Sequence, residues 1–290
     1  MDTPKARERL YDFGPGVTAA VCFGLTDVLS KVVFAAGTDV ITLALFRGLV
    51  GIAFMLIYLR IGPPLRPQSS RTHWIQLGLG VLFAGIVFGI FKALELVPVP
   101  IAILTYFAYP LLTGIAGALL GIDKLTWRGA AAALAAFFGL VLMIGAHPQA
   151  VAAAGIAFGL FAALCRVAVL LIARAKLNDA DPRLTTWNSL VASTVIFLFA
   201  ALVTMNWHMP QTTVGWAAII AVSICTAIAT LTIFISTTRV GPFRTALIMN
   251  LEPLLATILS APVLGEVITP VQALGGAVML AALVAFQLRR

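Results

Sequence analysis

Long apolar runs, separated by short polar breaks, fill the chain from about residue 15 to its end. Each run has about 20 residues, the length that a helix needs to cross a bilayer core of about 30 Å. Pro, Gly and charged residues mark the breaks. They predict ten membrane spans, near residues 15–36, 40–60, 73–94, 98–120, 125–145, 150–173, 183–204, 213–237, 242–263 and 268–288. The connections are short, so consecutive spans are expected to be antiparallel neighbours.

Composition supports a membrane protein. Hydrophobic residues make up 61% of the 290 positions and charged residues only 10%, whereas a soluble domain carries about 25% charged residues. Lipid around the molecule allows its outer surface to stay apolar. The first 13 residues lack the order of a signal peptide, so the first helix is expected to be retained. No segment is long enough for a separate soluble domain or a nucleotide-binding module.

The positive charge of the chain follows its connections. Of the 19 Lys and Arg residues, 15 lie in the N-terminal segment, in every second connection after it, and at the C-terminus: Lys5, Arg7, Arg9, Arg60, Arg66, Arg71, Lys124, Arg128, Arg174, Lys176, Arg183, Arg239, Arg244, Arg289 and Arg290. The opposite connections carry none. Cytoplasmic loops are enriched in Lys and Arg, so both termini are predicted to be cytoplasmic. Topology thus explains the net charge of +8, and no nucleic-acid partner is expected.

The two halves of the chain resemble each other. A shift of 143 positions places Pro110-Leu111-Leu112 on Pro253-Leu254-Leu255 and pairs Asp123 with Glu266. A shift of 135 positions places Phe23-Gly24 on Phe158-Gly159 and pairs Lys31 with Arg166. Each half has an odd number of spans, so the second half enters the membrane in the opposite sense, as in many secondary transporters. The predicted organisation is a cytoplasmic segment (1–14), a first repeat (15–145) and an inverted second repeat (150–290) around a central cavity.

Several motifs in these repeats are similar to those of a known family. The segments are Val240-Gly241-Pro242, Asn250-Leu251-Glu252-Pro253 and Leu264-Gly265-Glu266, with a first copy from Pro110 to Gly139 and an arginine, Arg47, in the second span. They resemble the EamA-type, ten-helix members of the drug/metabolite transporter superfamily, over nearly the whole chain. The turn Gly121-Ile122-Asp123 departs from the pattern, which has a Gly-Glu pair there, and this weakens any role carried over to that turn.

Within that superfamily the chain looks most like bacterial YddG-type exporters of aromatic and other amino acids. The resemblance implies a multi-pass protein of the bacterial inner membrane that exports small metabolites, foremost amino acids, by alternating access and without a cofactor. Lipophilic drugs, nucleobases or sugar nucleotides are alternative cargoes. A membrane enzyme or a receptor is a further alternative, but the sequence shows neither a catalytic or metal-ligand cluster nor a phosphate-binding glycine loop.

Charged residues inside the spans include Asp27, Lys31, Arg47, Lys92 and Arg166. Charges within a membrane are unfavourable and often mark a transport pathway, so these residues are candidates for gating or for contact with a charged substrate. Asp27 and Lys31 are four positions apart and share one helix face, which also fits a purely structural pair. Lys31, Lys92 and Arg166 are long enough to reach the nearer membrane surface instead.

Two prolines mark the expected central site. Pro110 and Pro253 fall near the middle of their spans, and each removes a helical hydrogen bond. Broken helices related by a pseudo-two-fold axis are where a transporter binds its cargo. The candidate cavity residues are Tyr106, Tyr109, Trp187, Asn188 and Glu252, and the candidate hinges are Pro98, Pro110, Gly241, Pro242 and Pro253. Glu252 is a candidate for binding an ammonium group or carrying a proton, and burial with satisfied hydrogen bonds is its structural alternative.

Overall fold

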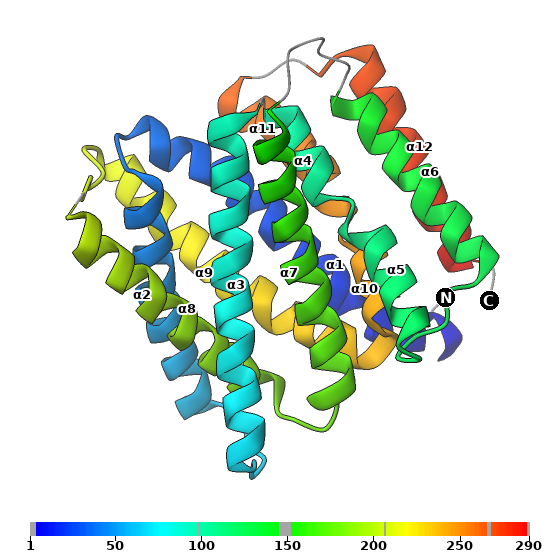
Figure 1. The fold of residues 1–290 in the computed structure, drawn as a ribbon, viewed down its shortest axis with the longest axis horizontal. Helices are drawn as coiled ribbons and strands as arrows, with labels where there is room; N and C mark the ends of the chain where they lie inside the picture. Colours follow the sequence, from blue (N-terminus) through cyan, green and yellow to red (C-terminus); the bar gives the residue numbers. More distant parts are fainter. Residues whose placement is uncertain (1–3, 98, 145–151, 206, 266–267, 289–290) are drawn as a thin grey trace.

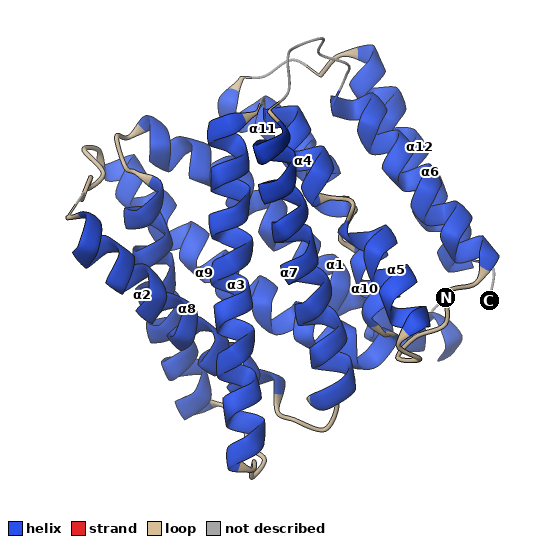
Figure 2. Cartoon of the chain, viewed as in Figure 1, coloured by secondary structure: helices blue, strands red, loops and turns tan. Residues whose placement is uncertain are grey.

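The computed structural model describes residues 4–97, 99–144, 152–205, 207–265 and 268–288, and within them all regular structure is helical (Figures 1 and 2). The twelve helices are α1 (Pro4–Ala35), α2 (Val40–Ile61), α3 (Ser70–Leu96), α4 (Val99–Tyr106), α5 (Tyr109–Leu119), α6 (Trp127–Ile144), α7 (Ala153–Lys176), α8 (Pro182–Thr204), α9 (Thr213–Val240), α10 (Pro242–Ile248), α11 (Leu251–Leu264) and α12 (Pro270–Leu288).

The helices have the length and composition of membrane spans. Eight stretches of the described residues are long and apolar enough to cross a bilayer, where α4 with α5, and α10 with α11, each count as one stretch. The apolar parts of α6 and α12, Trp127–Leu142 and Pro270–Ala285, are shorter. Together these make the chain a multi-pass membrane protein. Ten crossings, which require α6 and α12 to span as well, remain a prediction.

The first helix begins earlier than the apolar pattern indicates. α1 starts at Pro4, whereas the first span is expected to begin near residue 15. Proline fits the first turn of a helix because the amide hydrogen that it lacks has no intrahelical acceptor there. The segment expected to precede the first span is therefore helical from Pro4 onward.

Polar caps fix several helix boundaries. The side chain of Asp39 accepts hydrogen bonds from the amides of Ile41 (2.8 Å) and Thr42 (3.0 Å) at the start of α2. Ser69, Asp181 and Thr212 cap α3, α8 and α9 in the same way. Such caps satisfy amide groups of the first turn that have no partner inside the helix, which explains why the helices begin at these breaks.

The fourth span of each half is broken directly before its proline. α4 ends at Tyr106 and α5 begins at Tyr109, while α10 ends at Ile248 and α11 begins at Leu251. Pro110 and Pro253 donate no amide hydrogen, so the carbonyl groups one turn earlier lose their usual partner. The chain tightens at both places: the Ala108 amide donates to the Thr105 carbonyl and the Asn250 amide to the Leu247 carbonyl, each three residues earlier.

The packing relates the two halves. α1 packs on α9 and α11, and its counterpart α7 packs on α3 and on the fourth span of the first half. The fifth helices of the two halves, α6 and α12, pair with each other, as do the second helices, α2 and α8. These contacts are the ones that a pseudo-two-fold relation between the halves requires.

Close helix approach depends on glycine at several of these contacts. Gly24 of α1 lies where a Cβ atom would be 3.1 Å from the Glu252 carbonyl oxygen, and Gly159 of α7 where a Cβ atom would be 2.0 Å from Thr105 Oγ1. The sequence repeat pairs these two glycines. Each therefore sits against the broken helix of the opposite half, where small residues let backbones come together.

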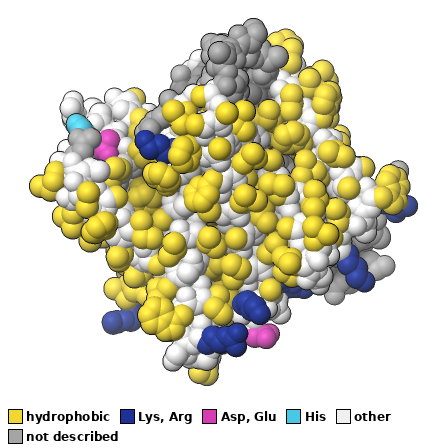
Figure 3. Space-filling model, in the orientation of Figure 1, with side chains coloured by type: hydrophobic (Ala, Val, Ile, Leu, Met, Phe, Trp, Pro, Cys, Tyr) yellow, Lys and Arg dark blue, Asp and Glu magenta, His cyan; other side chains and the backbone are white. Residues whose placement is uncertain are grey.

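The connections rich in Lys and Arg lie along the lower edge of the molecule in Figure 1, which we call the basic end (residues 60–71, 124–128, 174–183 and 239–244). Figure 3 shows hydrophobic side chains over most of the visible face, with most of the visible Lys and Arg side chains near its lower margin. An apolar belt with charges at its margin is the surface expected of a protein embedded in lipid.

At the basic end the two halves are in contact, and the described residues show no matching contact at the opposite end. α5 packs on α10, where a Cβ atom on Gly114 would lie 2.8 Å from the Phe243 ring. Asp123 Oδ2 accepts a hydrogen bond from the Phe243 amide at 3.2 Å. The pair related to α5 and α10 by the repeat is α11 and α4, and their described residues make no comparable contact. The two halves are therefore similar in fold but differ in how they meet at the two ends.

Candidate functional site

A buried arginine lies among the helices of both halves. Arg166 of α7 is 3% exposed, and its Nε donates a hydrogen bond to Tyr106 Oη at 2.9 Å. The guanidinium carbon lies 5.1 Å from the ring centre of Phe23, 5.8 Å from that of Tyr109 and 5.9 Å from that of Phe83. Three aromatic rings thus face the cation at cation–π distances. We call these five residues the Arg166 cluster.

Polar atoms around Arg166 lack partners. Arg166 Nη1, the Tyr109 hydroxyl and Glu252 Oε2 are all buried without a hydrogen-bond partner among the described residues. Leaving a buried donor or acceptor unpaired costs about 1–3 kcal/mol, and more for a charged group. A donor on a cation and an acceptor on a carboxylate within one region are suited to a ligand or water molecules that carry the complementary groups.

Two carboxylates act on the same cation. Glu252 of α11 is buried, and Asp27 and Arg166 both act on it electrostatically. Asp27 of α1 interacts electrostatically most strongly with Arg47, then with Arg166 and then with Lys31. The side chain of Asp27 is exposed even though α1 packs on α9 and α11. Charged side chains of α2, α7 and α11 act on it electrostatically.

The breaks in the two fourth spans determine where Tyr106, Tyr109 and Glu252 lie. Tyr106 is the last residue of α4 and Tyr109 the first of α5, so the turn between them brings their ring centres to 5.3 Å. Glu252 is the second residue of α11, directly after the equivalent break. The close contact at Gly24 brings α1 against the Glu252 backbone, and Asp27 follows on the same helix. The prolines and one glycine thus assemble groups that are far apart in the sequence.

Trp187 and Asn188 lie in other surroundings. Asn188 Nδ2 donates to Gln76 Oε1 at 2.5 Å and lies 3.1 Å from His73 Nδ1. This polar contact joins α3 and α8 within their first two turns, near the basic end. Trp187 packs in an apolar cluster with Met55 and Leu190. The structure thus separates these two candidate cavity residues from Tyr106, Tyr109 and Glu252.

The remaining candidates are spread over the fold. Gly241 joins α9 to α10 with a φ of 92°, a left-handed conformation that favours glycine, and Pro242 starts α10. Lys92 lies on α3, more than two turns beyond Phe83 in the direction away from the basic end. Pro98 lies outside the described residues.

Sequence reasoning missed the aromatic partners of Arg166 on α1 and α3. Phe23 and Phe83 are two of 18 phenylalanines in a chain where every predicted span contains at least one. One signal was present for Phe23: it precedes Asp27 by four positions, so the two share a helix face. No comparable signal marks Phe83.

No cofactor site emerges from these residues. Within the part of the chain that the structure describes, no three His, Cys, Asp or Glu side chains come together in a way that could hold a metal ion. The Arg166 cluster offers a cation, hydroxyl groups, rings and nearby carboxylates. These groups can form hydrogen bonds, ion pairs and ring contacts with a ligand.

Comparison with known proteins agrees with the fold. A solved structure described only as "Crystal structure of protein" superposes with a TM-score of 0.78 at 20% sequence identity, covering 97% of this chain and 99% of that one. It shows a shared fold. No curated protein sequence matches the chain significantly.

A family model matches the chain twice. The model of the EamA-like transporter family fits residues 16–145 and again residues 153–286. These two matches show the two repeats, and together they cover most of the chain. The protein therefore belongs to the EamA-like transporter family of the drug/metabolite transporter superfamily.

Proposed function

We propose that this membrane transporter exports amino acids, including aromatic ones, from the bacterial cytoplasm by alternating access. The observation that carries the proposal is the Arg166 cluster, in which a buried guanidinium with an unpaired Nη1 lies in electrostatic range of Asp27 and Glu252. A zwitterion has complementary groups: a carboxylate for the cation and an ammonium for a carboxylate. Charge-assisted hydrogen bonds of this kind are about twice as strong as neutral ones.

Aromatic rings support the choice among amino acids. Phe23, Phe83 and Tyr109 surround Arg166, and rings favour edge-to-face or offset contacts with another ring. An aromatic side chain next to them would bury its apolar surface while its charged groups stay paired. This would shield a polar solute that could not cross hydrocarbon unaided.

The closed basic end supports alternating access. If the positive-inside rule places the basic end in the cytoplasm, the contact between α5 and α10 closes the cytoplasmic side. The inverted halves would then exchange their roles, so that α4 and α11 close the opposite side while α5 and α10 separate. In this topology both termini are cytoplasmic and all ten spans cross the membrane.

An anionic cargo is the second candidate. Arg47, Arg166 and Lys31 outnumber the two carboxylates that they act on, Asp27 and Glu252. An excess of positive charge favours substrates with more negative than positive charge, such as sugar nucleotides. It disfavours lipophilic cations.

A substrate screen in proteoliposomes tests the proposal. Labelled amino acids, nucleobases and sugar nucleotides are offered to liposomes with and without the purified protein, in the presence and absence of a pH gradient. We expect flux of aromatic amino acids above that of empty liposomes. No flux of any amino acid would contradict the proposal, and flux of sugar nucleotides alone would favour the second candidate.

A further inference from the structure

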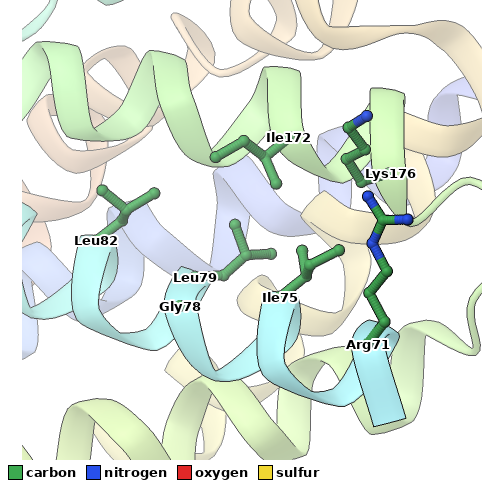
Figure 4. A pocket seen from close by; sticks show the side chains of 7 residues that line it. All are labelled: Arg71, Ile75, Gly78, Leu79, Leu82, Ile172 and Lys176. Carbon is green, nitrogen blue, oxygen red and sulfur yellow. The ribbon is translucent and has the colours of Figure 1, made fainter. Parts of the chain in front are cut away.

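A groove lies between α3 and α7, the two helices at the front of the molecule in Figure 1, and Figure 4 shows the side chains that line it. Its volume is about 430 Å³. Ile75, Leu79 and Leu82 of α3 and Ile172 of α7 line it with aliphatic side chains. Arg71 and Lys176, from the ends of the two helices at the basic end, complete the lining.

Glycine positions explain why a groove forms here. Farther along α3, Gly85 and Gly89 allow close approach to α7, with Cβ positions 3.0 Å from Cys165 Sγ and 2.9 Å from the Phe158 carbonyl oxygen. Gly78 lines the groove, and a Cβ atom on it would meet nothing within 4 Å. The two helices are thus in tight contact beyond the groove, and the missing side chain of Gly78 leaves space within it.

Two cations mark one end of this groove. Figure 4 shows Arg71 reaching from α3 toward Lys176 of α7, with the aliphatic side chains extending away from them along the helices. Both residues are exposed, and neither has a salt bridge to any other described residue. Trp74, next to the groove on α3, is 71% exposed. An exposed tryptophan is typical of the level where lipid headgroups meet the hydrocarbon.

The dimensions fit a lipid. Arg71 and Leu82 are 11 residues apart on one helix, which corresponds to about 16 Å along its axis. The cations would therefore stand at headgroup level while the aliphatic lining extends about half-way through a bilayer core. A soluble phosphate compound would use the two cations but not the aliphatic part.

We propose that this groove binds an anionic phospholipid of the leaflet at the basic end. Its phosphate lies between Arg71 and Lys176, and one acyl chain lies along Ile75, Leu79, Leu82 and Ile172. Charge complementarity selects the headgroup, because basic pockets between membrane helices attract anionic lipids. The lipid would bridge α3 of the first half and α7 of the second.

Lipid binding by the delipidated full chain in detergent tests the proposal. Phosphatidylglycerol and phosphatidylcholine with identical acyl chains are titrated, and bound lipid is counted by native mass spectrometry while the unfolding midpoint is recorded. We expect one phosphatidylglycerol to bind and to raise the midpoint at concentrations where phosphatidylcholine does neither. Arg71→Gln with Lys176→Gln should weaken phosphatidylglycerol binding about 30-fold.

Two further variants distinguish the contribution of the groove's shape to lipid binding from that of its charge. A Cβ atom on Gly78 would meet nothing within 4 Å, so Gly78→Leu adds a side chain inside the groove and should reduce phosphatidylglycerol binding while leaving the midpoint without lipid unchanged or higher. Lys124→Gln with Arg128→Gln removes the same charge from another exposed site at the basic end and should leave binding unchanged. Equal binding of both lipids, an equal loss in this control, or equal stabilisation by glycerol phosphate would each overturn the proposal.

Discussion

Arg166 combines burial with incomplete hydrogen bonding. Its Nε is paired with the Tyr106 hydroxyl, its face is covered by aromatic rings, and its Nη1 has no partner among the described residues. Burial of a cation in apolar surroundings is strongly unfavourable unless it is paired. The carboxylates of Glu252 and Asp27 offset this electrostatically, through space rather than through a direct contact. Such a group is suited to a substrate that completes its hydrogen bonds.

The two tyrosines should differ when each loses its hydroxyl. Tyr106→Phe removes a hydrogen bond to a charged group, which contributes about 1.5–3 kcal/mol, so the unfolding midpoint should fall. The Tyr109 hydroxyl is buried without a partner among the described residues, so Tyr109→Phe should leave the midpoint unchanged or raise it. If that hydroxyl meets the substrate, Tyr109→Phe raises KM about 2- to 12-fold. Thermal unfolding and transport kinetics of both variants check this, and equal midpoints for the two would contradict it.

Glu252 is the carboxylate to test for proton coupling. Glu252→Gln keeps the shape of the side chain but removes its charge and its titration. We expect transport by this variant to lose its dependence on pH between 5 and 8, with an altered rate. Initial rates across that interval are measured for both proteins. Kinetics identical to the parent protein would leave Glu252 with a structural role only.

The sequence predicts the composition of the site better than its arrangement. Charges and prolines inside apolar spans stand out because membranes rarely tolerate them, and this pointed to Asp27, Arg166 and Glu252. Which face of a helix meets the site is a matter of packing, and in a chain that is apolar all round the pattern carries little of that information. Asn188 pairs with Gln76 rather than with the tyrosines for this reason.

The helices themselves are predictable because the bilayer imposes their length and composition. Most expected spans correspond to helices within a few residues, and the breaks before Pro110 and Pro253 follow from the missing amide hydrogens. The early start of α1 was not predictable from hydropathy, since its first turns are polar. The pairing of α6 with α12 could not be predicted from the sequence either, because it depends on contacts between segments far apart along the chain.

The contact of α6 with α12 should be sensitive to a single added side chain. A Cβ atom on Gly139 would lie 2.7 Å from the Gly275 carbonyl oxygen and 2.8 Å from the Met279 amide nitrogen. Both are backbone atoms, so the helices must move apart. Gly139→Val should destabilise the protein by about 1–3 kcal/mol, measured as a lower unfolding midpoint. Gly14→Val, in open space on α1, is the control, and an equal effect of both changes would argue against the contact.

At the scale of the whole molecule, two inverted halves of one fold meet differently at their two ends. α5 and α10 touch at the basic end, whereas the described parts of the related helices, α11 and α4, make no comparable contact. An inverted repeat provides a second arrangement of similar energy in which these roles are exchanged. The Arg166 cluster lies where helices of both halves meet, so either arrangement leaves it between the two ends.

The Asp123 contact should hold the basic end closed. Asp123→Ala removes the acceptor for the Phe243 amide, whereas Asp123→Asn keeps one. A cysteine placed at the buried position Thr113 reports opening of this end through its rate of maleimide labelling. We expect Asp123→Ala to raise that rate about 2- to 12-fold and Asp123→Asn to leave it unchanged. The labelling uses a background without Cys22, Cys165 and Cys225, with reagent at the basic end. Equal labelling rates for both variants would contradict a role of Asp123 in holding the basic end closed.

The most direct test of the account is counterflow in proteoliposomes. Vesicles loaded with unlabelled phenylalanine are diluted into a trace of labelled phenylalanine, and accumulation of the label is followed with time. A carrier that exposes the Arg166 cluster to each side in turn accumulates label transiently against its gradient, and Arg166→Gln, folded to the same extent, does not. Absence of accumulation by the parent protein for every amino acid, or equal accumulation by the Arg166→Gln variant, would contradict the account.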